Sequence, residues 1–412
     1  MKIFFHCIFP LFFIFAHFSV YAQEIPVTDK TISKSYPFIN AANNRIVNGK
    51  GLNPFFQKLL GLKKENKGVL SIVHIGDSHI QADYFTEIIR TGLQQFFGNA
   101  GRGLVFPFQL AQSNAPPDIN SSSNTPWEYN RLAHPEIPIA SGISGYCIRT
   151  NFSGAAIDIG LKPDLKYTPQ TFDRLKLFLK IDSTVSWILQ AANNNPSFLI
   201  RKEESDTAVF KEVVLDQSTD SFSLSSLPSV SLKEFYGVSL ERSDPGIIYH
   251  TIGVNGATYN SYNSAPLFWK QLPALKADLY IISLGTNEAQ KTGLDRATFL
   301  QQMDIFFANL KLISPDAAVL ITTPADDFYK RHRPNAFLKQ INSGITSYST
   351  VHNLPLWDMY RITGGHGSSY KWLKRGLMNK DRVHFTNEGY RIQGALFFNA
   401  LSKEYNLFLN SN

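Results

Sequence analysis

Cysteine is scarce in this sequence. Of its 412 residues only Cys7 and Cys147 are cysteine, and Cys7 lies in an apolar segment at the N-terminus. If that segment is removed, one cysteine remains, which excludes an internal disulfide and any metal site built from several thiolates. A lone cysteine is most often an inert buried side chain, and this is the expectation for Cys147.

The chain also lacks a dense block of basic residues. Its 40 Lys and Arg residues outnumber its 33 Asp and Glu residues, giving a formal charge of +7 that is spread along the chain. A nucleic-acid site needs basic side chains gathered on one face, so nucleic acid is not an expected partner. A mild positive charge is compatible with an anionic polymer such as a cell-wall glycan.

The first 22 residues combine one Lys with a long Phe/Ile/Leu-rich run and end in a small residue. This pattern is typical of a secretory signal peptide, with cleavage expected after Ala22. An uncleaved anchor is the alternative, but the segment is barely long enough to span a bilayer, and His6, Pro10 and His17 interrupt it. We therefore expect an exported, envelope-associated protein, periplasmic or extracellular.

Residues 68–75 (GVLSIVHI) form a short, β-branched apolar run that is typical of a buried strand. After Ser78 the apolar period becomes helical, and Gly98 offers an end to the helix. The residues on the expected apolar face are Ala82, Phe85, Ile88, Ile89, Leu93 and Phe96. Ser78 is therefore expected at a strand-to-helix junction.

The middle of the chain differs from its two ends. Residues 111–245 contain a Pro/Ser/Asn-rich loop and then short alternating runs, which predict an all-β sandwich. From residue 246 strands and helices alternate, which predicts a parallel sheet flanked by helices. We expect an α/β domain of residues 23–110 and 246–412, with function at the carboxyl ends of its strands.

The motif Gly-Asp-Ser-His at residues 76–79 places Ser78 at such a strand end. It is not the G-x-S-x-G elbow, because Ile80 occupies the place of the second glycine. Ser78 is either a helix N-cap or a nucleophile. We expect both roles together, because the N–H groups at a helix start can also stabilise an oxyanion.

Three further motifs follow in order. Gly256 in GVNGATYN forms a tight turn or lets a backbone N–H approach a ligand closely. Asn287 in SLGTNEA caps a loop or donates its side-chain amide to an oxyanion. In KDRVHFT, Asp381 and His384 are close enough for one loop to supply a general base and the carboxylate that orients it, although surface loops contain many such pairs.

The four blocks GDSH, GVNGA, GTNE and DRVHFT together resemble those of the SGNH hydrolase (GDSL-like esterase) superfamily. The resemblance covers residues 68–110 and 246–405, and it implies a flavodoxin-like three-layer α/β/α fold and a serine esterase. It also implies Ser78 as nucleophile, His384 as base and Asp381 as its orienter. The backbone N–H groups of Ser78 and Gly256 and the Asn287 side chain would form the oxyanion hole.

A narrower likeness is to the bacterial peptidoglycan O-acetylesterases. GDSH in place of GDSL, GTNEA, and an all-β insertion between the first two blocks are similar to that group, in which the insertion resembles a carbohydrate-binding module. Aromatic residues of the insertion, such as Trp127, Tyr146, Trp187 and Phe198, could stack on sugars, but packing in a sandwich core is the expected role.

We expect the other polar residues near the motifs to have structural roles. His74 lies within the apolar strand and is expected in the core, and Asp77 is expected to hydrogen-bond the turn. His79 is expected to line the cleft or pack under it without acting as base. Glu288 either holds the oxyanion loop or is solvated, and solvation is the expectation.

No cofactor is expected. A binuclear metal site would need several further His and Asp ligands at matching strand ends, and GDSH and GTNE lack them.

The sequence thus predicts an esterase that removes O-acetyl groups from an envelope polysaccharide, O-acetylated peptidoglycan first. The open alternatives are a deacetylase or acetyltransferase acting on another glycan, and an inactive glycan-binding protein. Oligomeric state is left open.

Overall fold

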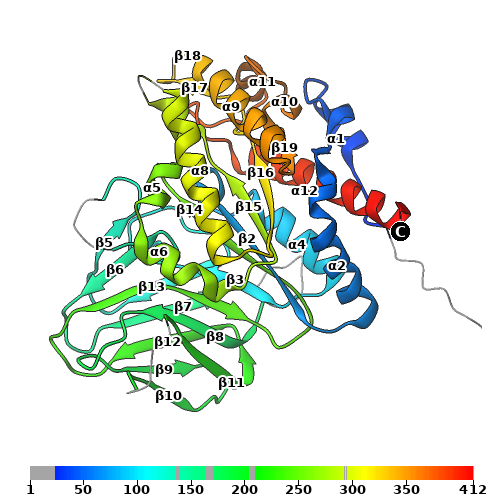
Figure 1. Cartoon of the computed structure of the whole chain (residues 1–412). Coiled ribbons are helices and arrows are strands. Elements are labelled where there is room, and N and C mark those ends of the chain that lie inside the picture. The colour runs from blue at the N-terminus through cyan, green and yellow to red at the C-terminus, as the bar shows by residue number, and fades with distance from the viewer. Residues whose placement is uncertain are drawn as a thin grey trace, which may run out of the picture.

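A computed structural model describes residues 24–135, 140–162, 170–203, 209–291, 293 and 295–411, so the expected signal peptide lies outside the described residues. A six-stranded sheet runs through the upper part of the molecule (Figure 1), parallel except for its edge strand β1. Its order is β1 (Ile46–Val47), β19 (Leu356–Trp357), β16 (Ala318–Thr322), β15 (Leu279–Ser283), β2 (Val69–Asp77) and β14 (Gly246–Val254).

Helices cover both faces of this sheet. Side chains of β2 alternate between two cores: Ile72 packs with α2 (Asn53–Glu65), α4 (Thr86–Phe97) and α12 (Asn387–Ser411), whereas Val73 belongs to the core that includes α8 (Arg296–Ile313) and α9 (Ala336–His352). The three-layer α/β/α arrangement with a parallel sheet is therefore confirmed. Among the described residues, no helix has the length and apolarity needed to cross a bilayer.

Two antiparallel sheets form the lower part of the molecule (Figure 1). One has the order β10 (Ser197–Ile200), β9 (Trp187–Ala191), β12 (Ser221–Ser226), β7 (Ala156–Leu161) and β4 (Ile119–Ser123). The other has the order β11 (Lys211–Thr219), β8 (Phe172–Leu179), β13 (Lys233–Glu241), β6 (Tyr146–Thr150) and β5 (Glu128–Arg131), and β3 (Gly101–Val105) also pairs with β13. The short alternating runs of residues 111–245 therefore form antiparallel strands, as expected of an all-β module.

The aromatic residues of this β module pack as expected of a sandwich core. Trp127, Tyr146 and Trp187 are buried, and Phe198 is partly buried against the same cluster. Cys147 is also buried and unbonded, as predicted.

One expected helix is divided. The helix predicted after Ser78 is broken between α3 (Ser78–Gln81) and α4, where Asp83 adopts a left-handed backbone with φ of 65°. The Asp83 carboxylate is buried and forms ion pairs with Arg90 and Arg102, both at 2.6 Å, and Arg102 also pairs with Asp118. These long-range ion pairs explain a break that helical periodicity alone could not predict. Gly98 ends α4, as predicted.

Candidate active site

Ser78 lies at the carboxyl end of β2, between β14 and β15 in the parallel sheet. Asp77 is the N-cap of α3, because its Oδ1 accepts a hydrogen bond from the backbone N–H of His79 at 3.0 Å. The expectation that Ser78 caps this helix is therefore wrong. Ser78 is the first helical residue instead, which leaves its hydroxyl available for other contacts, while the turn-bonding role expected of Asp77 is confirmed.

The structure brings together three of the predicted site residues through hydrogen bonds of ordinary length. His384 Nε2 lies 2.8 Å from Ser78 Oγ, and His384 Nδ1 lies 2.9 Å from Asp381 Oδ2. The other oxygen of Asp381 accepts the backbone N–H groups of Val383 and His384, both at 2.9 Å, which holds the loop in place. The side chains of Asp381 and His384 remain 33% and 35% exposed, so solvent and small molecules can reach them.

The negative charges around His384 favour the protonated form of its imidazole. Burial by itself lowers the pKa of His384, but the hydrogen bond and charge of Asp381 outweigh it, and the pKa is raised above 6.5. The charges of Asp77 and Asp327 act in the same direction. Burial opposes ionisation of Asp381, yet the hydrogen bonds from His384 and Val383 hold the pKa of its carboxyl well below the usual range. A negative Asp381 beside His384 is the arrangement that a general base requires.

The two other predicted residues meet at the turn after β14. Gly256 adopts φ of 84°, a left-handed conformation that favours glycine. Asn287 lies in α7 (Thr286–Gln290), and its Nδ2 donates to the backbone oxygen of Ala257 at 2.9 Å and approaches Asp77 Oδ2 at 3.4 Å. The Asn287 amide therefore lies between the Gly256 turn and the residue that precedes Ser78.

Glu288 corrects a second expectation. Its side chain is buried rather than solvated, and its Oε1 accepts the backbone N–H of Tyr259 at 2.8 Å. Burial raises the pKa of Glu288 to about 7. Glu288 thus fixes the segment just after Gly256, which is the alternative to solvation that the sequence left open.

The two nearby histidines have structural contacts. His74 is fully buried, with its ring nitrogens 2.7 Å from Tyr249 Oη and 2.7 Å from Ser283 Oγ, as expected of a core histidine. His79 Nδ1 lies 3.0 Å from Tyr390 Oη, and its ring is 5.2 Å from that of His384. His79 thus packs beside His384, as expected.

A cavity of about 450 Å³ opens beside Gly256. The β module supplies one wall, and the loop and helices after β14 supply the other. Its lining mixes apolar and polar side chains and includes two basic residues, Arg131 and Lys291, and His134 lies over Gly256. Apart from Gly256, none of the five predicted site residues lines this cavity.

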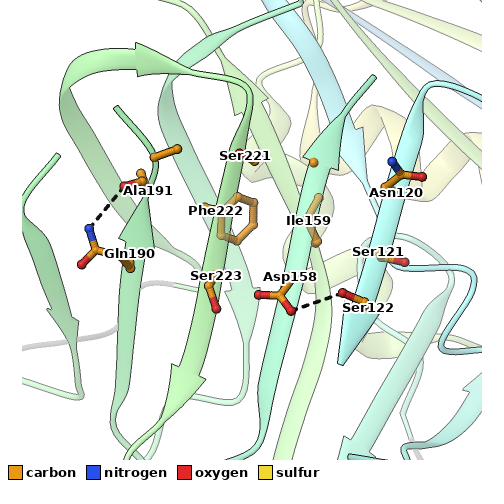
Figure 2. A pocket seen from close by; sticks show the side chains of 12 residues that line it. Asn120, Ser121, Ser122, Asp158, Ile159, Gln190, Ala191, Ser221, Phe222 and Ser223 are labelled. Atoms are coloured by element: carbon orange, nitrogen blue, oxygen red, sulfur yellow. Dashed lines mark hydrogen bonds between the residues drawn. The ribbon is translucent and has the colours of Figure 1, made fainter. Parts of the chain in front are cut away.

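A larger cavity, of about 690 Å³, lies on the five-stranded sheet of the β module. Figure 2 shows Ser121, Ser122, Asp158, Gln190 and Ser223 along neighbouring strands of this sheet. These are small polar groups that can donate and accept hydrogen bonds. In the part of the chain that the structure describes, no group of three or more His, Cys, Asp or Glu side chains could hold a metal ion.

Comparisons with known proteins agree with this geometry. Residues 232–392, which include Gly256, Asn287, Asp381 and His384, match the GDSL-like Lipase/Acylhydrolase family. No curated protein sequence matches the chain at a significant level.

Among solved structures, a peptidoglycan O-acetylesterase aligns with a TM-score of 0.71 and 21% identity, over 91% of this chain and 99% of that chain. A lipase/acylhydrolase from Enterococcus faecalis and a GDSL-like lipase from Bacteroides thetaiotaomicron are each 22% identical over 38% of this chain. They are covered to 77% and 76%, with TM-scores of 0.30 and 0.31. The family match confirms the resemblance to the SGNH superfamily, and the first of these structures shows that the resemblance to its peptidoglycan O-acetylesterases extends to the fold.

Proposed function

We propose that the chain is an exported serine esterase that removes O-acetyl groups from a cell-envelope polysaccharide, with O-acetylated peptidoglycan as its substrate. The observation that carries this proposal is the hydrogen-bonded series from Ser78 Oγ through His384 to Asp381 Oδ2, at 2.8 and 2.9 Å. The match to a family of acylhydrolases agrees with it.

In the proposed reaction, His384 Nε2 takes the proton of Ser78 as its Oγ attacks the acetyl carbonyl carbon. The resulting oxyanion accepts hydrogen bonds from the backbone N–H groups of Ser78 and Gly256 and from Asn287 Nδ2, which gives up its 3.4 Å contact with Asp77 Oδ2. Protonated His384 then gives its proton to the departing sugar oxygen, which leaves an acetyl ester on Ser78. Water, deprotonated by the same imidazole, releases acetate and restores the serine.

The substrate assignment is supported by the surroundings of Gly256. The adjoining cavity is large enough for a sugar unit, and its hydroxyl, amide and basic groups suit a polar, anionic glycan better than a lipid. The similar solved structure is named for action on peptidoglycan. We assign catalysis to residues 23–110 and 246–412 and polymer contact to the β module of residues 111–245, whose cavity carries serine, aspartate and glutamine side chains that can hydrogen-bond to sugar hydroxyls.

The proposal is tested by measuring acetate released from O-acetylated peptidoglycan by the secreted chain, by Ser78→Ala, and by Ser347→Ala as a matched control. Ser347 is an exposed serine of α9, and its hydroxyl accepts a long hydrogen bond of 3.3 Å from Arg296. We expect release by the parent and the control and none by Ser78→Ala. Release by Ser78→Ala at the parent rate would overturn the proposed mechanism. Cleavage of 4-nitrophenyl acetate without release of acetate from peptidoglycan would support the mechanism and overturn the substrate assignment.

A further inference from the structure

The β module contacts the segment at the end of β14 that carries Gly256. Gly145 packs so tightly that a Cβ there would lie 2.3 Å from Val254 Cγ2, and the ring of His134 lies over Gly256. Next to Gly145, Tyr146 begins strand β6 of the module, and its side chain is fully buried. The inserted module is therefore in direct contact with the proposed oxyanion turn.

Tyr146 reaches this turn through Gln81, three residues after Ser78. The Tyr146 hydroxyl donates to Gln81 Oε1 at 3.0 Å, and the same oxygen accepts the backbone N–H of Asn255 at 2.9 Å. The Asn255 N–H immediately precedes the peptide that supplies the Gly256 N–H. One buried carbonyl oxygen thus joins the module, the helix that begins at Ser78 and the turn.

Ser113 completes the cluster. Its hydroxyl accepts from Gln81 Nε2 at 2.8 Å and from Asn255 Nδ2 at 3.2 Å, and it lies 3.1 Å from the Tyr146 hydroxyl. With two donors already directed at it, the Ser113 hydroxyl is left to donate its own proton to Tyr146. Every hydroxyl in the cluster then has a partner, so the Gln81 amide has one favoured orientation.

We propose that Tyr146 is a positioning residue for the oxyanion turn, acting through Gln81. This inference rests on the proposed function. Without the Tyr146 hydroxyl, Gln81 Oε1 keeps only the Asn255 N–H, whereas Gln81 Nε2 stays bound to Ser113 and to the backbone oxygen of Asn114. The lost restraint is therefore on Oε1, the amide atom that contacts the turn. The Gly256 N–H then loses the fixed direction on which stabilisation of a developing oxyanion depends. The inserted module would thereby contribute to catalysis itself as well as to glycan contact.

The test uses Tyr146→Phe in the full secreted chain with 4-nitrophenyl acetate, a substrate too small to need the glycan cavity. Phenylalanine keeps the ring contacts with Phe106 and Phe108, whose centroids are 5.3 and 5.2 Å away. We expect kcat to fall about tenfold, because displacing a donor costs less than removing it. KM and the pH at which activity is half-maximal should stay near their parent values, since His384 is untouched.

The matched control is Tyr236→Phe. Tyr236 is a buried tyrosine of the same sheet, and its hydroxyl donates to Glu234 at 2.7 Å instead of to the cluster. This control should retain the parent kcat. Thermal unfolding of each variant checks the fold, and Ser113→Ala, which breaks the same cluster from its other side, replaces Tyr146→Phe if the latter does not fold.

A double-mutant cycle with Gln81→Ala separates positioning from general weakening of the fold. If Tyr146 acts through Gln81, Tyr146→Phe adds no further loss of kcat to Gln81→Ala, whereas independent effects multiply. Multiplying losses, or a Tyr146→Phe variant with the parent kcat, would overturn the inference while leaving the esterase intact. A parent chain without Ser78-dependent hydrolysis would instead overturn the proposed function, and this inference with it.

Discussion

Asp381→Asn tests most sharply how His384 is made a base. The Oδ1 atom of Asp381 holds the backbone N–H groups of Val383 and His384, and an asparagine oxygen can keep both bonds. The new amide nitrogen then takes the place of Oδ2, which lies 2.9 Å from His384 Nδ1. As a donor, it forces Nδ1 to accept, so the single proton of the neutral ring moves to Nε2.

That proton faces Ser78 Oγ, only 2.8 Å away, and a protonated Nε2 cannot accept the serine proton. We expect kcat to fall by about 10⁴, the loss measured for the same change in a serine protease triad, which corresponds to about 5 kcal/mol of transition-state stabilisation. The loop should keep its shape, so thermal stability should change little. The loss is therefore one of chemistry rather than folding.

The same variant changes the pH dependence. The parent needs neutral His384, so its kcat/KM should rise with pH through the His384 pKa, which lies above 6.5, and be lost below it. Removing the Asp381 charge removes the main influence that raises this pKa, so the remaining activity should extend to lower pH.

The assay is hydrolysis of 4-nitrophenyl acetate across a pH series. Asp295→Asn is the control, since Asp295 caps α8 and asparagine caps a helix equally well. A parent-like kcat in Asp381→Asn, or an acid limb that does not move, would refute this account of the base.

Three other changes have defined outcomes. Asn287→Ala should lower kcat by about 10²–10³ in steady-state kinetics with little change in KM, and an equal loss in kcat/KM through KM alone would contradict its oxyanion role. Arg102→Ala leaves the carboxylates of Asp83 and Asp118 with Arg90 as their one remaining cation among these ion pairs, and it should cost about 3–5 kcal/mol in urea unfolding. Arg174→Ala, which breaks only the exposed ion pair with Glu212, should lower the free energy of unfolding by at most about 1 kcal/mol. Equal losses in the two variants would contradict the importance of burial. The native state of the parent binds the Glu288 proton more tightly than the unfolded chain does, so the parent should lose stability as pH rises from 4.5 to about 7. Glu288→Gln should lessen this loss in unfolding measured across pH, and an unchanged pH dependence would contradict the effect of burial on Glu288.

The sequence identified those features that depend on local pattern. The buried strand before Ser78 and the glycine turn at Gly256 have local signals, because apolar runs and Asn-Gly pairs report directly on the backbone. The order of the four motifs, through the resemblance to the SGNH superfamily, then allowed Asp381 and His384 to be predicted as partners of Ser78. Their meeting with Ser78 follows from the parallel sheet, whose strands end at one edge.

What the sequence could not reveal depends on contacts between distant residues or on competition between adjacent ones. The helix break at Asp83 is held by Arg102, and Asp77 rather than Ser78 became the cap because two adjacent polar residues compete for one helix start. The bond between Gln81 and Tyr146 joins positions 65 residues apart, with no local pattern to mark it. Such contacts emerge only once the β module is placed against the parallel sheet.

The measurement that tests the central claim most directly is labelling with a fluorophosphonate, which reacts irreversibly with activated serine nucleophiles, followed by mass spectrometric mapping of the modified peptide. The account predicts a single label on Ser78, complete loss of acetate release in step with labelling, and no label in Ser78→Ala or His384→Ala. Acetate release that persists while Ser78 is fully labelled, or an active chain whose label lies on another residue, would contradict it.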